Sequence, residues 1–404
     1  MQKNIIKLLI IFGICTQCSS QTSDTLFLLN VKNEIGLEIP IELNLPKVQD
    51  NEKLLLAKSL DNPDVEFILQ KTPSFFSPNY SSDYSCFSTI LTNSVSDGEY
   101  RITSYDEKPI FKIEENKNGQ LTVFEEGNPA LTYNFGMQLK EGVPKRYQRS
   151  SYIHPIYDLE GNILTDDFPD DHYHHRGLSW MWPKIFIDSV RYDLWHIYGQ
   201  QGDLEGIHQV FEKWLMKEVG PICATFGAKN IWQLDSGQKV MDEWVYVKVY
   251  KANENSRAID IKLVFKASVE IGLEGQTKKG YGGLNFRFSP RIETKITSQF
   301  GKEEDSDLKS LPWADQSAIF GDNNYFSGVS IFQRKSNNNF PAGWCLRHYG
   351  FLGVEWPGVE RYNMNPGETF TLSFRILVHQ GNAVEGSVES AYKIFSDPPV
   401  VEYK

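Results

Sequence analysis

The chain has 404 residues, of which 40% are hydrophobic and 23% are charged, a balance typical of a soluble globular protein with a sizeable core. This length allows two domains, or one large β domain with an appendage. The formal net charge of −11 argues against nucleic acid as a partner, because a phosphate backbone requires a basic surface.

The first 20 residues read as a secretory signal peptide. Basic residues accompany an apolar run at 5–14, and small polar residues follow it. The run is too short to span a membrane, and no later stretch is long enough to do so. Cleavage near Ser20 predicts a periplasmic or secreted protein, with a lipid anchor at Cys15 or Cys18 as the alternative.

Residues 25–115 show the pattern of a small β-sandwich domain. Short alternating runs such as TLFLLNV, VEFILQ and GEYRITSY are separated by clusters of Asn, Asp, Pro and Ser, which favour turns. The run DGEYRI is expected to form the closing strand. No histidine occurs in this segment, so we expect a structural or sugar-binding module.

Residues 116–404 are expected to form a second, larger β domain. Runs such as ALTYNFGMQL, EWVYVKVY and TFTLSFRILVHQ indicate strands, whereas 208–218 could form a helix or a strand and ESAYKIFSD a short helix. The abundant aromatic residues also favour strands. We therefore predict an all-β chain, with a large antiparallel two-sheet supersandwich after the small N-terminal β-sandwich.

Three cysteines remain after the proposed cleavage. Cys86, Cys223 and Cys345 are too widely separated for a disulfide framework or a zinc cluster. We expect buried free thiols, with one disulfide as the alternative in an oxidising compartment.

The stretch DDFPDDHYHHRGLSW holds three of the eight histidines of the chain. Asp, Pro and Gly mark a loop that leads into a Trp-rich strand. An extended chain would place His172 and His174 on one face and His175 on the other. Proton transfer, metal binding and a polar surface loop are all open for these residues. We favour proton transfer, with Arg176 gripping a carboxylate and with no bound metal or cofactor.

Other polar residues lie in comparable contexts, and each taken alone is more often structural than catalytic. Together they provide the side chains that a sugar acid requires. These candidates are His208, Glu243, Lys278, Tyr281, Arg287 and His348. Motifs for dinucleotide binding, phosphate binding, a serine nucleophile or a zinc protease are absent from the sequence.

Several of these segments resemble the bacterial family labelled "methane oxygenase PmoA". The resemblance covers roughly residues 130–385 and includes HPIYDLEG, DHYHHRGLSW, KKGYGGLNFRF, WADQSA and WCLRHYGFLG, with Tyr173 where the family usually has proline. A membrane oxygenase subunit requires several apolar spans, so methane oxidation is excluded. The segment MNPGETFTLSFRILVHQ also resembles the supersandwich of galactose mutarotases.

The resemblance implies a carbohydrate-active dehydratase with an oligosaccharide as partner. Such an enzyme removes water from the non-reducing-end uronic acid of an oligosaccharide, for example an ulvan fragment, and leaves a 4,5-unsaturated uronate. In this interpretation Arg176, Arg287 and Lys278 hold the carboxylate, and His172 and Glu243 contact the substrate. The base is His174 or His175, and the acid is His208, His348 or Tyr281.

Two other classes stay open at this point. One is a glycoside hydrolase, epimerase or chain-cleaving lyase on the same fold, with Glu243 as base or acid. The other is a non-catalytic glycan-binding protein.

Overall fold

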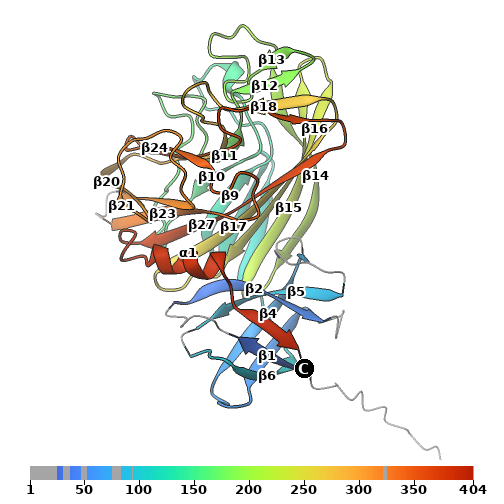
Figure 1. The fold of residues 1–404 in the computed structure, drawn as a ribbon, viewed down its shortest axis with the longest axis vertical. Coiled ribbons are helices and arrows are strands. Elements are labelled where there is room, and N and C mark those ends of the chain that lie inside the picture. Colours follow the sequence, from blue (N-terminus) through green and yellow to red (C-terminus); the bar gives the residue numbers. More distant parts are fainter. Residues whose placement is uncertain are drawn as a thin grey trace, which may run out of the picture.

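The computed structural model describes residues 25–30, 37–46, 52–74, 83–92, 94–321 and 325–403. The expected signal peptide and the alternative lipid-anchor cysteines lie outside these ranges. The described residues form four antiparallel sheets, which confirms the all-β prediction (Figure 1). No helix among them is long and apolar enough to cross a membrane.

The N-terminal sheet has seven strands in the order β2-β5-β4-β3-β6-β1-β28. Its strands are β1 (Thr25–Asn30), β2 (Ile39–Pro46), β3 (Leu54–Ser59), β4 (Glu66–Thr72), β5 (Tyr84–Leu91), β6 (Gly98–Ser104) and β28 (Val400–Tyr403). The sheet curls until its edge strands β2 and β28 contact each other. DGEYRI was expected to close this unit, but β6 lies inside the sheet, because it pairs with β1 on one side and β3 on the other.

Two larger sheets form the supersandwich. The eight-stranded sheet contains β7 (Phe111–Asn116), β8 (Gln120–Glu125), β9 (Asn128–Asn134), β10 (Tyr152–Ile156), β11 (Leu178–Met181), β19 (Gly283–Arg287), β24 (Gly343–Arg347) and β25 (Phe351–Glu355). The nine-stranded sheet contains β14 (Ile207–Val219), β15 (Cys223–Leu234), β16 (Lys239–Tyr250), β17 (Ser256–Ala267), β20 (Arg291–Ser298), β21 (Gly301–Lys302), β22 (Trp313–Phe320), β23 (Tyr325–Gln333) and β27 (Thr369–Gln380). The ambiguous segment 208–218 is therefore a strand, and β7 places the start of the supersandwich at 111 instead of 116.

The main core lies between these two sheets. Side chains alternate along a strand, so each strand of the eight-stranded sheet sends every second residue into this core. Trp180 and Phe286 are core residues of this kind. Trp182, just after β11, bridges the sheets, with its ring 5.4 Å from Trp232 and 5.5 Å from Phe265. The intervening residues of β11, β19, β24 and β25 point to the opposite face, which therefore is free to carry polar side chains.

A small sheet and one helix complete the described fold. The four-stranded sheet contains β12 (Lys184–Ile187), β13 (Val190–Tyr192), β18 (Ile271–Glu274) and β26 (Tyr362–Met364). The expected short helix is α1 (Val388–Ser396), which buries Val388, Ala391 and Phe395 in the core shared with the N-terminal sheet. The three predicted free thiols are confirmed as buried and unpaired cysteines.

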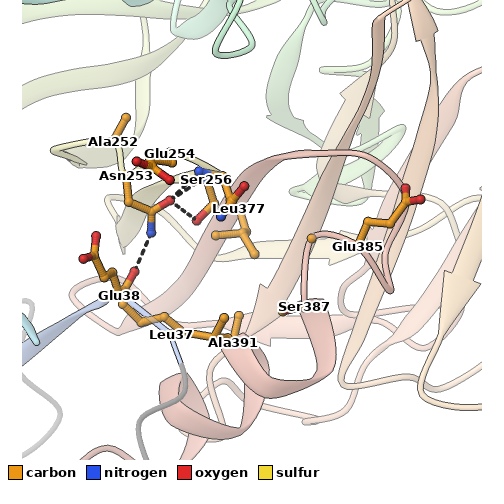
Figure 2. A pocket seen from close by; sticks show the side chains of 13 residues that line it. Leu37, Glu38, Ala252, Asn253, Glu254, Ser256, Leu377, Glu385, Ser387 and Ala391 are labelled. Atoms are coloured by element: carbon orange, nitrogen blue, oxygen red, sulfur yellow. Dashed lines mark hydrogen bonds between the residues drawn. The ribbon is translucent and has the colours of Figure 1, made fainter. Parts of the chain in front are cut away.

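Buried charges join the N-terminal sheet to the supersandwich. Nζ of Lys248 lies 2.6 Å from Oε1 of Glu42, and neither side chain is more than 5% exposed. A pocket of about 700 Å³ lies at the same junction, between Glu38, the turn around Asn253 and the start of α1. The Asn253 amide donates to the Glu38 carbonyl at 2.7 Å, and Figure 2 draws this hydrogen bond among the residues that line the pocket. The two units are thus connected by specific polar contacts.

Candidate active site

The histidine motif forms a turn between β10 and β11. The backbone N–H of His172 donates to the Pro169 carbonyl at 3.0 Å, and the N–H of His175 donates to the His172 carbonyl at 2.9 Å. The His172 and His175 rings therefore stack with centroids 4.7 Å apart. The expectation that they occupy opposite faces was wrong, because a turn, unlike an extended strand, brings residues three apart together.

A fourth imidazole, His196, completes a histidine cluster with His172, His174 and His175. Its ring lies 4.4 Å from that of His174, which in turn lies 4.6 Å from that of His175. Asp193 fixes this residue: one carboxylate oxygen accepts the backbone N–H of His196 at 2.8 Å, and the other lies 2.9 Å from Nδ1. Sequence reasoning missed His196, although the spacing D-x-x-H in YDLWHIYG was a usable signal.

The polar face of the eight-stranded sheet lies next to this cluster. Phe351 of β25 pairs with Arg287 of β19, and Glu355 pairs with Gly283 of the same strand. Arg287, Asn285 and Glu355 therefore share the face that points away from the main core. The ring of Phe351 lies 5.2 Å from that of His175, which joins the histidine cluster to this face.

Asp171 connects the cluster to Arg287. Its carboxylate accepts two hydrogen bonds from Nη2 of Arg287, at 2.8 and 3.0 Å, and lies 2.9 Å from Nδ1 of His172. The Arg287 guanidinium lies 5.1 Å from the ring centroid of Tyr349, and that ring stacks on His172 at 5.9 Å. Burial opposes ionisation of Asp171, but His172 and Arg287 outweigh it and lower the pKa of this carboxyl. Arg287, His172 and Tyr349 thus form one group around Asp171.

Glu355 marks the other end of the polar face. One carboxyl oxygen accepts the backbone N–H of Leu308 at 2.8 Å, and the other is buried without a hydrogen-bond partner among the described residues. Burial raises the pKa of Glu355 to about 8, so this carboxyl is a proton donor at neutral pH. Glu355, Cys345 and Asp307 have ligand atoms within 4.8 Å of one another and form the one group among the described residues that could hold a metal ion. The expectation of no metal stays a prediction.

Burial sets the protonation states in the histidine cluster. It lowers the pKa of His174 and of His175 well below the usual value, and the neighbouring imidazoles add to this effect. Both rings are therefore neutral at physiological pH. Burial also raises the pKa of Tyr349 and of Tyr281 to about 12, so both phenols keep their protons. The site holds neutral bases beside protonated donors.

Several buried polar atoms of this region have no partner among the described residues. They include Nδ1 of His172 and of His175, Oδ1 of Asn285, Nε and Nη1 of Arg287 and Oε1 of Glu355. An unpaired buried polar group is costly, and native proteins rarely retain one without a role. Trp195, whose ring lies 4.8 Å from that of Tyr281 and 6.2 Å from that of Phe351, adds an aromatic wall. A few polar groups among aromatic side chains are typical of a small-molecule site, so these residues are candidates for contacting a ligand.

Arg176 and Glu243 occupy interior positions. The Arg176 side chain is 0% exposed, lies 3.2 Å from Asp167 and packs over the Phe168 ring. Glu243 lies inside the main core, where Ser151, Gln209, Asn230 and Trp232 donate to its carboxylate. These placements do not support the predicted contact of either residue with a substrate. Both instead hold the surrounding structure together.

The other predicted residues divide into two groups. Tyr281 and Arg287 lie at the site just described. His208 instead pairs with Asp235 at 2.9 Å, His348 pairs with Asp305 at 2.7 Å, and Lys278 is exposed on a turn. The structure therefore brings five of the predicted residues together: His172, His174, His175, Tyr281 and Arg287. His196, Tyr349 and Glu355 join them as residues without a predicted role.

Comparisons with known proteins give a family without an assigned activity. A family model described as "Family of unknown function (DUF6807)" matches residues 120–393. No comparison supports the methane oxygenase label. No curated protein sequence matches the chain.

The similar solved structures include three sugar-related proteins. They are an alpha-galactosidase from Lactobacillus brevis (TM-score 0.31, 9% identity, 70% of this chain and 40% of that chain), a galactose mutarotase related enzyme from Lactobacillus acidophilus (0.30, 10%, 67% and 98%) and a galactose 1-epimerase from Lactobacillus acidophilus NCFM (0.29, 9%, 86% and 100%). This chain thus spans 40% of the length of the galactosidase. At these TM-scores and identities the similarity carries no conclusion about activity.

Proposed function

Because this chain belongs to the DUF6807 family, whose function is unknown, we propose its activity from its own site: acid–base chemistry on an acidic sugar. The observation that carries the proposal is the convergence of the histidine cluster with Arg287 and Tyr349 on one polar sheet face. The reaction is dehydration of a uronic acid at the non-reducing end of an oligosaccharide. The product is a 4,5-unsaturated uronate.

Arg287 is the proposed carboxylate-binding residue. Asp171 holds Nη2 and orients the guanidinium, while Nε and Nη1 have no partner among the described residues. A guanidinium hydrogen-bonds a carboxylate strongly, because both groups are charged and planar. Binding there withdraws charge from the substrate carboxylate, which makes the neighbouring C5 proton more acidic and stabilises the enediolate that forms on its removal.

His172 is the proposed base and Tyr349 the proposed acid. Nδ1 of His172 lies 2.9 Å from the Asp171 carboxylate without making a hydrogen bond, and Nε2 is the proposed proton acceptor. Nε2 takes the C5 proton, and the electron pair forms the C4–C5 double bond as the C4–O bond breaks. The phenol of Tyr349 gives its proton to the departing hydroxide, which leaves as water. The His172 and Tyr349 rings stack with centroids 5.9 Å apart, and the Arg287 guanidinium lies 5.1 Å from the Tyr349 centroid, so the proposed base and acid are both close to the proposed carboxylate-binding residue.

Mass spectrometry and ultraviolet absorbance test this reaction directly. Purified protein is incubated with uronate-terminated oligosaccharides, and we expect the loss of one water with unchanged chain length. Arg287→Lys keeps the charge but not the planar fork, and we expect kcat/KM to fall by about 10²–10³-fold. Lys112→Ala, which removes a side chain that is 72% exposed, is the matched control. Unchanged masses across the substrate panel would refute the dehydratase proposal.

Glu355 favours a second candidate function. A protonated, buried carboxyl on the polar face is the donor that a glycoside hydrolase or an epimerase uses. In that case the same incubation gives shorter chains or an isomer of unchanged mass, and Glu355→Gln abolishes the activity. Loss of water that survives Glu355→Gln excludes this alternative.

A further inference from the structure

A second pocket, of about 600 Å³, lies between the short 3-10 turn at Lys145–Tyr147 and the β14–β15 hairpin. Its lining includes Met137, Lys145, Arg146, Tyr198, His208 and Asp235, and we call it the Tyr198 pocket. None of these residues belongs to the histidine cluster. His208, which was expected in the active site, lies here.

The charge of the Tyr198 pocket is opposite to that of the chain. Lys145 and Arg146 are exposed at its wall, whereas the chain as a whole has a formal net charge of −11. Asp235 is the one acidic residue among the described residues of the lining, and it lies 2.9 Å from Nε2 of His208. A local basic pocket in an acidic protein selects a small anion by its charge.

The lining also suits a sugar ring. The rings of Tyr198 and His208 contact each other edge to face at 5.8 Å, and Met137, Val210 and Leu234 supply apolar surface. Gln148 and Gln233 add amides that both donate and accept hydrogen bonds. Aromatic and apolar surface with a few polar groups is the composition of a pocket for a small polar ligand.

Two short chain segments connect residues of the Tyr198 pocket to residues of the candidate active site. Tyr198 follows His196 by two residues, and its backbone N–H donates to the His196 carbonyl at 3.0 Å. Gln148 precedes Arg149, whose buried guanidinium donates to the Trp195 carbonyl at 3.0 Å. The Tyr198 pocket therefore lies close along the chain to His196 and Trp195 of the candidate active site.

We propose that the Tyr198 pocket binds a second acidic sugar of the oligosaccharide whose end occupies the histidine cluster. Lys145 and Arg146 hold the anionic group, and the Tyr198 ring packs against the sugar. The proposal rests on the proposed function, in that the active-site ligand is an acidic glycan. A carboxylate and a sulfate ester are both anions that Lys145 and Arg146 can bind. Substrates that differ only in sulfation distinguish the two.

The test compares substrate length with binding. For the double variant Lys145→Ala/Arg146→Ala we expect the Kd of a uronate-terminated tetrasaccharide, measured by calorimetry, to rise about tenfold, with the Kd of the disaccharide unchanged. Tyr198→Ala tests the ring contact separately, and Lys112→Ala controls for the loss of an exposed charge. If the double variant raises the Kd of the sulfated tetrasaccharide only, the bound anion is a sulfate ester. If it raises the Kd of the unsulfated tetrasaccharide equally, the bound anion is a carboxylate.

Binding and turnover separate the two proposals. A tetrasaccharide that binds without losing water, and binds more weakly to the double variant, supports the pocket while the dehydratase proposal fails. If the double variant changes the Kd of the tetrasaccharide and of the disaccharide equally, or changes neither, the proposed sugar binding in the Tyr198 pocket is wrong. The dehydratase proposal is then judged by mass loss alone. Circular dichroism and thermal unfolding verify that each variant is folded.

Discussion

Replacing Glu243 by Gln tests whether this carboxylate is structural. Oε1 accepts from Ser151 at 2.6 Å and Asn230 at 2.8 Å, and Oε2 accepts from Gln209 at 2.9 Å and Trp232 at 2.7 Å. An amide keeps one acceptor oxygen but turns an NH₂ group toward two of these donors. Each buried donor left unpaired costs about 1–3 kcal/mol, so we expect the free energy of unfolding to fall by about 2–6 kcal/mol.

Urea denaturation followed by tryptophan fluorescence measures this loss. Glu114→Gln is the matched control, because its carboxylate is 47% exposed and pairs with an exposed lysine, and we expect a change within about 0.5 kcal/mol. Activity per folded Glu243→Gln molecule should stay near the wild-type value. A loss of activity without a loss of stability would refute the structural role and return Glu243 to the substrate-contacting set.

Three further changes probe buried charges. Lys248→Met removes the cation that pairs with the buried Glu42 carboxylate at the domain junction. We expect the free energy of unfolding to fall by about 3–5 kcal/mol, against less than about 1 kcal/mol for the exposed Lys58→Met. An equal loss of stability in the two variants would contradict a stabilising role of the Lys248–Glu42 ion pair. Burial raises the pKa of Glu355 above its unfolded value, so wild-type stability should fall as pH rises from about 5 to 8. Glu355→Gln should lack this fall, and a parallel pH profile would argue against the raised pKa. Burial opposes a charge on His379, but Asp315 outweighs it and raises its pKa, so the stability advantage over His379→Gln should be full below pH 6.5 and decline at higher pH. A stability difference between wild type and His379→Gln that grows with pH would contradict the raised pKa of His379.

The strand content and part of the site were predictable because they depend on local patterns. Alternation of apolar residues indicated strands such as β16 and β27, and the Asp/Pro/Gly-rich context placed the histidine motif in a loop. The motif also concentrated three imidazoles within four positions, so any turn or strand would keep them close. Local reasoning failed for the side-chain directions, since a hydrogen bond from His175 to His172 bends the chain into a turn.

The sequence by itself determined an all-β chain, its buried thiols and the histidine-rich loop, because composition and short-range periodicity suffice for these features. Only the tertiary structure decided which polar residues face the site. Glu243 and Glu355 both lie on strands among apolar residues, yet one points into the core between the sheets and the other onto the polar face. That difference depends on strand register and on which face another sheet covers. Both are set by pairings between residues far apart in the chain, such as Gly283 with Glu355.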